Sequence, residues 1–354
     1  MGILDDKLDV VGLTRALCDI ESVSGNESAI ADAVEAFLRT CDHLEVTRDG
    51  DALIARTSLG RPQRVVIAGH IDTVPVNDNL PTRLEGDVLW GRGTVDMKAG
   101  VAVQLRLAKD LVDPIHDVTW IFYDHEEVEA TLNGLGRLSR NHPELLAGDF
   151  AILGEPSNAI IEGGCNGTMR AAISTTGERA HSARAWMGSN AIHAAHVILD
   201  RLAAYEPKTV TVDGLDYREG LNAVGIRGGI AGNVIPDECV VDVNFRFAPS
   251  KTEVEAFAEI TALFPEFDVV LTDSAAGARP GADSPLAQSF IAAVGGTIAP
   301  KFGWTDVARF TALGIPAVNY GPGNPSLAHM DDERVEVSDI HACEAGLRTW
   351  LGGH

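Results

Sequence analysis

Short runs of β-branched and other apolar residues alternate with helical patterns in the first half of the chain, and polar residues follow each run. The segments 64–69, 118–124 and 150–154 have the continuous apolar character of buried strands, whereas 27–40 and 98–112 have helical periodicity. This alternation is typical of an open α/β sheet. Ligands of such sheets lie beyond the carboxyl ends of the strands, so we expect the residues after these runs to meet at one edge.

The pattern of predicted strands and helices changes at about residue 168. From there, six segments follow in the order β-α-β-β-α-β of a ferredoxin-like module. The α/β character then returns, ending in a helical pattern near 337–351. A chain of 354 residues also exceeds the usual size of one core. We therefore expect a discontinuous α/β domain (1–176 and 282–354) and an inserted α+β domain (177–281).

Composition excludes several classes of function. A formal net charge of −23 disfavours nucleic acid and anionic membrane surfaces, which are bound through cationic side chains. No stretch reaches the roughly 18 uncharged apolar residues of a membrane-spanning helix, and no signal peptide is evident, so we expect a cytoplasmic protein. The five cysteines are widely spaced without a CxxC pair, which indicates neither a disulfide framework nor a thiolate zinc site.

Five short motifs carry histidine and carboxylate residues on the expected strand-end loops. Histidine and carboxylate side chains are common zinc ligands in proteins, and two zinc ions together can activate water and stabilise an oxyanion. Each motif alone is a weak signal, because a lone histidine is more often a cap and adjacent glutamates are usually solvated. Their combination indicates a two-metal hydrolase. The motifs are GHIDTVP (69–75), GRGTVDMKAG (91–100), YDHEEVEA (123–130), LGEPSN (153–158) and LAHMDDE (327–333).

With these motifs the chain resembles the aminoacylase/carboxypeptidase family of co-catalytic zinc metallohydrolases, and the resemblance spans nearly its whole length. It implies a zinc-peptidase-like catalytic domain with a mixed sheet flanked by helices, and an inserted lid through which two chains form a homodimer. It also implies two Zn²⁺ per subunit, for which Co²⁺ or Mn²⁺ can substitute. The implied ligands are His70 and Glu155 for one zinc, Glu127 and His329 for the other, and Asp96 as the bridge.

The same resemblance places Asp72 beside the His70 imidazole, where a hydrogen bond would fix its tautomer. Three ligand carboxylates and one hydroxide balance the charge of two Zn²⁺. Glu126 is then left over beside a ligand, which suits a general base that passes a proton from water to the leaving amine. His125 is expected to point away from the site.

The longer stretches 177–193, 232–250, 301–310 and 315–333 resemble a branch of the family that acts on acylated amino acids with several carboxylates. Arg246 is suited to clamp a carboxylate, although an ion pair within the inserted domain is the alternative. Asn233 and Thr305 match substrate-contacting positions, although both residue types are also common in turns.

His181, in AHSAR, resembles a lid histidine that stabilises the oxyanion in the partner subunit's active site. Surface exposure or capping is the alternative for this residue.

Two other functions remain open. The same machinery could act on another acyl group or amino acid, as in acetylornithine deacetylases, aminoacylases or dipeptidases, because loops determine specificity. A catalytically silent binding protein is the other alternative. Loss of a ligand or of the base would be its signature, and none is missing here.

Overall fold

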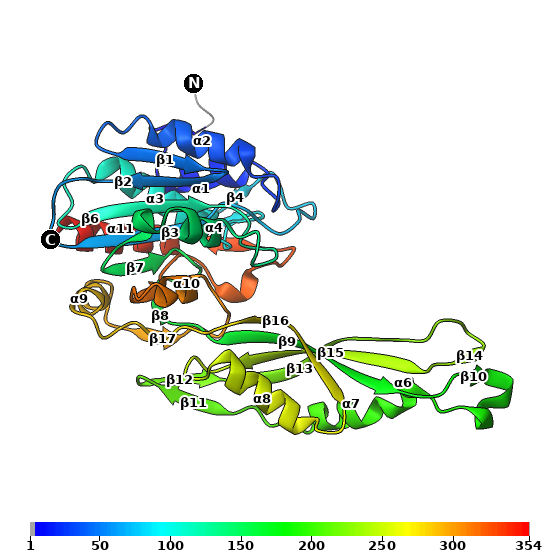
Figure 1. Cartoon of the computed structure of the whole chain (residues 1–354). Coiled ribbons are helices and arrows are strands. Elements are labelled where there is room, and N and C mark those ends of the chain that lie inside the picture. The colour runs from blue at the N-terminus through cyan, green and yellow to red at the C-terminus, as the bar shows by residue number, and fades with distance from the viewer. Residues whose placement is uncertain (1–3, 354) are drawn as a thin grey trace. The chain divides into compact units, whose positions relative to one another are not determined.

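The computed structural model describes residues 4–353, which form two compact units. Unit 1 contains residues up to Gly163 together with 280–299 and 305 onward, and unit 2 contains 164–279 and 300–304. Unit 1 is therefore discontinuous in sequence. Figure 1 shows the chain coloured from its N-terminus to its C-terminus.

Unit 1 is built on an eight-stranded mixed sheet with the strand order β1-β2-β6-β3-β7-β18-β8-β17. Its central strands β6, β3, β7 and β18 run parallel to one another, so their carboxyl ends share one edge. The strands are β1 (Glu45–Asp49), β2 (Ala52–Arg56), β3 (Arg64–His70), β6 (Asp117–Tyr123), β7 (Phe150–Leu153), β8 (Ile161–Gly163), β17 (Ile298–Pro300) and β18 (Ala317–Asn319).

Helices flank this sheet, and a small sheet of order β19-β5-β4 accompanies it (Figure 1). The helices are α1 (Val10–Cys18), α2 (Ser28–Leu38), α3 (Lys98–Asp110), α4 (Gly134–Asn141), α5 (Pro143–Leu146), α9 (Pro285–Ala293), α10 (Val307–Ala312), η2 (Pro325–Leu327) and α11 (Val337–Gly352). The strands of the small sheet are β4 (Arg83–Glu85), β5 (Val88–Trp90) and β19 (Arg334–Glu336).

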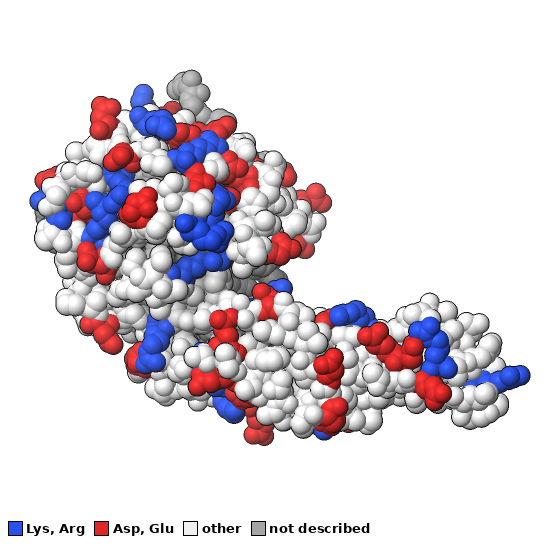
Figure 2. All heavy atoms as spheres, viewed as in Figure 1, with Lys and Arg blue, Asp and Glu red and all other residues white. Residues whose placement is uncertain are grey.

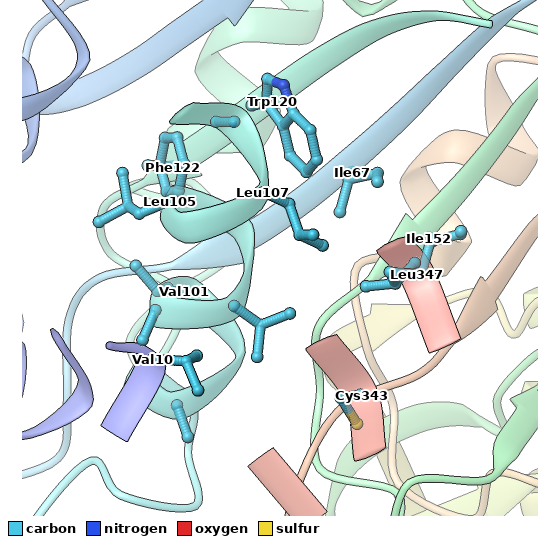
Figure 3. Close-up of a cluster of buried hydrophobic side chains, with 14 of the residues drawn as sticks. Val10, Ile67, Val101, Leu105, Leu107, Trp120, Phe122, Ile152, Cys343 and Leu347 are labelled. Atoms are coloured by element: carbon cyan, nitrogen blue, oxygen red, sulfur yellow. The ribbon is translucent and has the colours of Figure 1, made fainter. Parts of the chain in front are cut away.

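The core of unit 1 forms where α3 and α11 meet the central strands (Figure 3). Leu105 and Leu107 of α3 are fully buried with Ile67, Trp120 and Phe122 of the sheet. Burial of each such side chain stabilises the fold by about 1.5–3 kcal/mol. The edge that carries the polar loops is thus supported by a continuous apolar core.

Unit 2 contains a four-stranded antiparallel sheet of order β13-β15-β9-β16, and helices α6, α7 and α8 contact it. This is the strand order of a ferredoxin-like module, so the expected fold class is confirmed for both parts of the chain. The elements are β9 (Gly167–Thr176), β10 (Ala180–His181), η1 (Ser182–Met187), α6 (Ala191–Ala194), α7 (His196–Ala203), β11 (Thr209–Val212), β12 (Leu215–Arg218), β13 (Gly220–Gly228), β14 (Val234–Ile235), β15 (Glu238–Phe247), α8 (Glu253–Leu263) and β16 (Asp268–Ala275).

The units divide at Gly163/Gly164 rather than between residues 176 and 177. Strand β9 lies in unit 2 because it pairs along its whole length with β15 and also with β16. The sequence pattern that begins at about residue 168 already counts this segment as the first strand of the ferredoxin-like module, and the pairing of β9 agrees with that pattern rather than with the expected bound at 176. The return to unit 1 falls at Pro280, two residues before the expected position.

Acidic and basic side chains are interspersed on the face shown in Figure 2. None of the helices within residues 4–353 combines the length and apolar character that crossing a membrane requires. All five cysteines lie in the described part of the chain, and all five are buried.

Candidate metal centre

The candidate ligands lie at the carboxyl edge of the parallel strands. His70 is the last residue of β3, Glu127 follows β6, and Glu155 follows β7. Asp96 precedes α3, and His329 follows η2 with its backbone in the left-handed region (φ 64°). His70 is thus at a strand end, and Glu127 and Glu155 lie in the loops directly after strands, as the sequence pattern predicts.

Asp96 lies between two imidazoles. Its Oδ1 is 3.1 Å from Nε2 of His70, and its Oδ2 is 3.2 Å from Nε2 of His329. His329 Nε2 is also 3.0 Å from a carboxylate oxygen of Glu127. One ligand atom from each of His70, Asp96 and Glu127 falls within a 4.8 Å group. Asp96 thus offers one carboxylate oxygen to each of two candidate histidine ligands, and its role as the bridge stays a prediction.

The electrostatics of this cluster suit a divalent cation. Burial alone would lower the pKa of His70, but hydrogen bonds to Asp72 and Asp96 outweigh it and raise the pKa well above its usual value. Hydrogen bonds to Asp96 and Glu127 raise the pKa of His329 to about 10. Burial would raise the pKa of Asp96, yet hydrogen bonds to both histidines lower it. Imidazole nitrogens and carboxylates that hold protons between them in this way form a donor set that a metal ion fits.

Asp72 is buried, and it contacts the loop after β6 as well as the His70 imidazole. Nδ1 of His70 lies 3.1 Å from the backbone carbonyl of Asp72 and 3.4 Å from its Oδ1. The Asp72 carboxylate accepts the backbone N–H groups of Glu126 (3.0 Å) and Glu127 (3.1 Å), and the Ser24 hydroxyl (2.6 Å). Asp72 therefore orients His70, the expected base Glu126 and the candidate ligand Glu127 together.

Glu126 is half-buried next to the cluster. Burial raises the pKa of Glu126 well above the usual value, although the charge of His70 lowers it. The negative charges of Asp306, Glu155 and Glu127 raise this pKa further. Glu155 is itself buried, and its charge also acts on His70. A carboxyl group in this environment readily holds a proton, as a general acid and base must.

Sequence reasoning missed the contacts that hold the loop after β6. The backbone N–H of His125 donates to Oε1 of the buried Glu27 (3.2 Å), and His125 Nδ1 lies 2.7 Å from Asp124 Oδ2. His125 has a left-handed backbone (φ 57°). Glu27 and Ser24 precede the loop by about a hundred residues, and no motif connects them to it, so only the three-dimensional structure could identify them.

Among the expected substrate residues, Thr305 is buried in unit 1, and its hydroxyl donates to Oδ1 of Asn319 (2.9 Å). In unit 2, Asn233 is exposed, and its carbonyl accepts the N–H of Ser182 (2.9 Å). The Thr305 hydroxyl is thus engaged within unit 1, whereas the Asn233 side chain is exposed and accessible to a ligand.

Arg246, on β15, is half-buried and donates from Nε to Oδ1 of Asn244 (3.1 Å). Within residues 4–353 no carboxylate lies at ion-pair distance from its guanidinium. Burial lowers the pKa of Arg246, and the like charge of Arg170 contributes. Two arginines near one another without an acidic partner create a site that favours an anion.

His181 is exposed on β10, which pairs with β14. The backbone N–H of Ala183 donates to its Nδ1 (3.0 Å), so in the neutral ring the proton lies on Nε2. The exposed Nε2–H is thus available as a hydrogen-bond donor. The structure brings four of the candidate ligands of unit 1 into direct contact, namely His70, Asp96, Glu127 and His329. His181, Asn233 and Arg246 belong to unit 2.

The α/β fold and the cluster of histidines and carboxylates at its strand edge define a metal-dependent hydrolase. The model of the peptidase family M20/M25/M40 matches residues 66–351, and the chain belongs to this family.

Full-length relatives support this assignment. A Mycobacterium tuberculosis protein is 53% identical over 99% of this chain and 100% of its own length, and its provisional name is succinyl-diaminopimelate desuccinylase DapE. A Corynebacterium glutamicum protein named succinyl-diaminopimelate desuccinylase is 46% identical over 97% of this chain and 96% of its own.

Solved structures share the fold. A Staphylococcus aureus tripeptidase has a TM-score of 0.79 at 20% identity, with 99% of each chain covered. Bacillus subtilis YXEP, described as a dinuclear metal-binding peptidase, has a TM-score of 0.71 at 16% identity over 97% of this chain and 96% of that one.

Proposed function

We propose that this protein hydrolyses N-succinyl-LL-2,6-diaminopimelate to succinate and LL-2,6-diaminopimelate, a step of lysine and diaminopimelate biosynthesis. The observation that carries the proposal is the cluster around Asp96, which provides the donor set of a two-metal amidohydrolase. The names of the full-length relatives support the choice of substrate.

We assign two Zn²⁺ to the site, held by His70 and Glu155, by Glu127 and His329, and by Asp96 between them. When bound, two zinc ions polarise the amide carbonyl and make water more acidic. Glu126 takes the proton of the attacking water on its carboxylate and delivers it to the leaving nitrogen. Asp72 holds the backbone of Glu126 in place through its Oδ1.

The substrate carries several carboxylates, and residues of unit 2 supply groups that can bind them. Arg246 offers a guanidinium without an acidic partner in the described chain, and Asn233 offers an exposed amide. The proposed role of Thr305 is indirect, because its hydroxyl is bonded to Asn319. His181 donates from Nε2 to the oxyanion of the tetrahedral intermediate.

We further propose a homodimer formed through unit 2, with His181 acting in the partner subunit's site. Strand β13 lies at an edge of the four-stranded sheet and exposes Val224 (63%) and Ile226 (53%). An exposed edge strand with β-branched side chains favours pairing with another chain. A second copy related by two-fold symmetry presents the same edge.

A substrate panel tests the proposed reaction. We expect metal-loaded protein to hydrolyse succinyl-diaminopimelate with the highest kcat/KM, ahead of acetylornithine and of dipeptides, and a chelator to remove the activity. The succinyl carboxylate should favour the proposed substrate by about 10-fold or more, the usual effect of one charge-assisted hydrogen bond. A preference for acetylornithine or for a dipeptide would contradict the proposal.

Arg246→Met should raise KM for succinyl-diaminopimelate by about 10–100-fold with a smaller change in kcat, because it removes a charge-assisted contact to the bound substrate. Steady-state kinetics measure both constants. Arg201→Met is the matched control, since Arg201 lies on α7 of the same unit rather than on the edge strand β13, and is already paired with Glu266. Equal KM values in wild type and Arg246→Met would remove Arg246 from substrate binding.

A further inference from the structure

A buried ion pair lies beside the candidate ligands without belonging to them. Arg92 and Glu333 are 3% and 1% exposed, and Nη1 of Arg92 lies 2.7 Å from Oε2 of Glu333. They are separated by 241 positions in the sequence. Both residues belong to unit 1.

Glu333 holds the backbone of the expected bridging ligand. Its Oε1 accepts the N–H of Val95 (2.9 Å) and the N–H of Asp96 (3.1 Å). The backbone N–H of Gly91 donates to the carbonyl of Glu333 (3.0 Å). Glu333 thus holds the loop that presents the Asp96 carboxylate at both of its ends, at Gly91 and at Val95–Asp96.

Arg92 holds the loop that carries His329. Nη1 donates to the carbonyl of Met330 (3.2 Å), the residue directly after His329, and Nε donates to the carbonyl of Pro75 (3.2 Å). His329 needs such support because its left-handed backbone (φ 64°) is unfavourable for a residue with a side chain. One ion pair therefore connects the backbones on both sides of the Asp96–His329 contact.

Stability alone is a poor explanation for this pair. Removing two charges from water costs free energy that their attraction often fails to recover, and apolar residues of similar volume are frequently as stable. An ion pair whose remaining hydrogen bonds go to the loops of two candidate ligands is better explained by the geometry that it fixes.

We propose that Arg92 and Glu333 are positioning residues that set the placement of Asp96 relative to His329, and thereby the affinity for the metal ion held by Asp96, Glu127 and His329. The inference rests on the proposed two-metal function. His70 is oriented independently, by the carbonyl of Asp72. Loss of the pair should therefore weaken one of the two metal-binding steps more than the other.

The test is titration of the metal-free full-length protein with Zn²⁺ in competition with a chelator. We expect Glu333→Gln to raise one of the two stepwise dissociation constants by about 10–100-fold, the usual effect of losing a partner behind a metal ligand. The other constant should change much less. Arg92→Lys keeps the charge but loses the forked geometry and should give a shift in the same step.

Asp117→Asn provides a matched control. Asp117 is also a buried carboxylate (4% exposed) and accepts the backbone N–H groups of Leu59 and Arg61 (both 2.8 Å). It is the first residue of β6, whereas the candidate ligand Glu127 follows the last residue of that strand. Both Asp117→Asn and Glu333→Gln should lower the melting temperature of the metal-free protein, while only Glu333→Gln should change zinc affinity.

Two outcomes separate this inference from the proposed function. If the wild type binds fewer than two zinc ions, the proposed two-metal function fails. If the wild type binds two and both constants are unchanged in Glu333→Gln and Arg92→Lys, the pair is only structural and the inference is wrong. Should Glu333→Gln fail to fold, Arg92→Lys alone decides between these outcomes.

Discussion

Glu126→Gln should lower kcat by about 10²–10⁴-fold, the usual contribution of a general acid–base group. Glutamine has nearly the shape of glutamate but cannot take a proton from water, so the chemical step loses its proton carrier while the fold is retained. The Glu126 backbone N–H that bonds Asp72 is unaffected by the change. Metal content should therefore stay at the wild-type value, which metal analysis of the purified variant measures alongside kcat.

The control for this variant is Glu129→Gln, an exposed acid three residues further along the same loop. It removes the same charge without touching the cluster, so its kcat should equal that of the wild type. Wild-type turnover in Glu126→Gln, with full metal content, would show that another group carries the proton.

His181→Ala should lower kcat by about 10²–10³-fold, the usual cost of removing one oxyanion donor. His181 is in unit 2, whereas the candidate ligands are in unit 1, so zinc content should not change. His193→Ala is the matched control, because His193 is an exposed histidine on α6 of the same unit. Retained turnover in His181→Ala would remove this residue from the mechanism.

Mixing the two inactive variants tests whether His181 acts across the dimer. A heterodimer of Glu126→Gln and His181→Ala chains combines an intact Glu126 from one subunit with an intact His181 from the other at one of its two sites. Random exchange at equal concentrations should then restore about a quarter of wild-type activity, since half of the dimers are mixed and each has one intact site. No recovery after demonstrated subunit exchange would mean that His181 acts within its own chain.

The sequence predicted the features that depend on periodicity and on strand ends. The apolar runs before His70, Glu126 and Glu155 are the parallel strands β3, β6 and β7, and the fold class is confirmed. Strand-end positions follow directly from the pattern because the carboxyl ends of parallel strands share an edge.

The contacts that hold the site could not be predicted in the same way. Asp72 bonds backbone N–H groups, which every residue except proline has and which leave no trace in a sequence. The Arg92–Glu333 pair joins segments more than two hundred residues apart. The roles of individual site residues stay predictions, which the experiments above address.

The strand order of unit 1 has a consequence for biosynthesis. Strand β18 lies between β7 and β8, although it follows them by about 150 residues and the whole of unit 2 is synthesised first. When synthesis has just continued beyond β8, strand β18, which pairs with both β7 and β8, has not yet been made. The loop that carries His329 is also still missing. Until the ribosome has released residues 317–329, the emerging sheet carries an open edge that invites aggregation. Such a chain is a natural client for chaperones, and its candidate ligands can come together only after His329 has been synthesised.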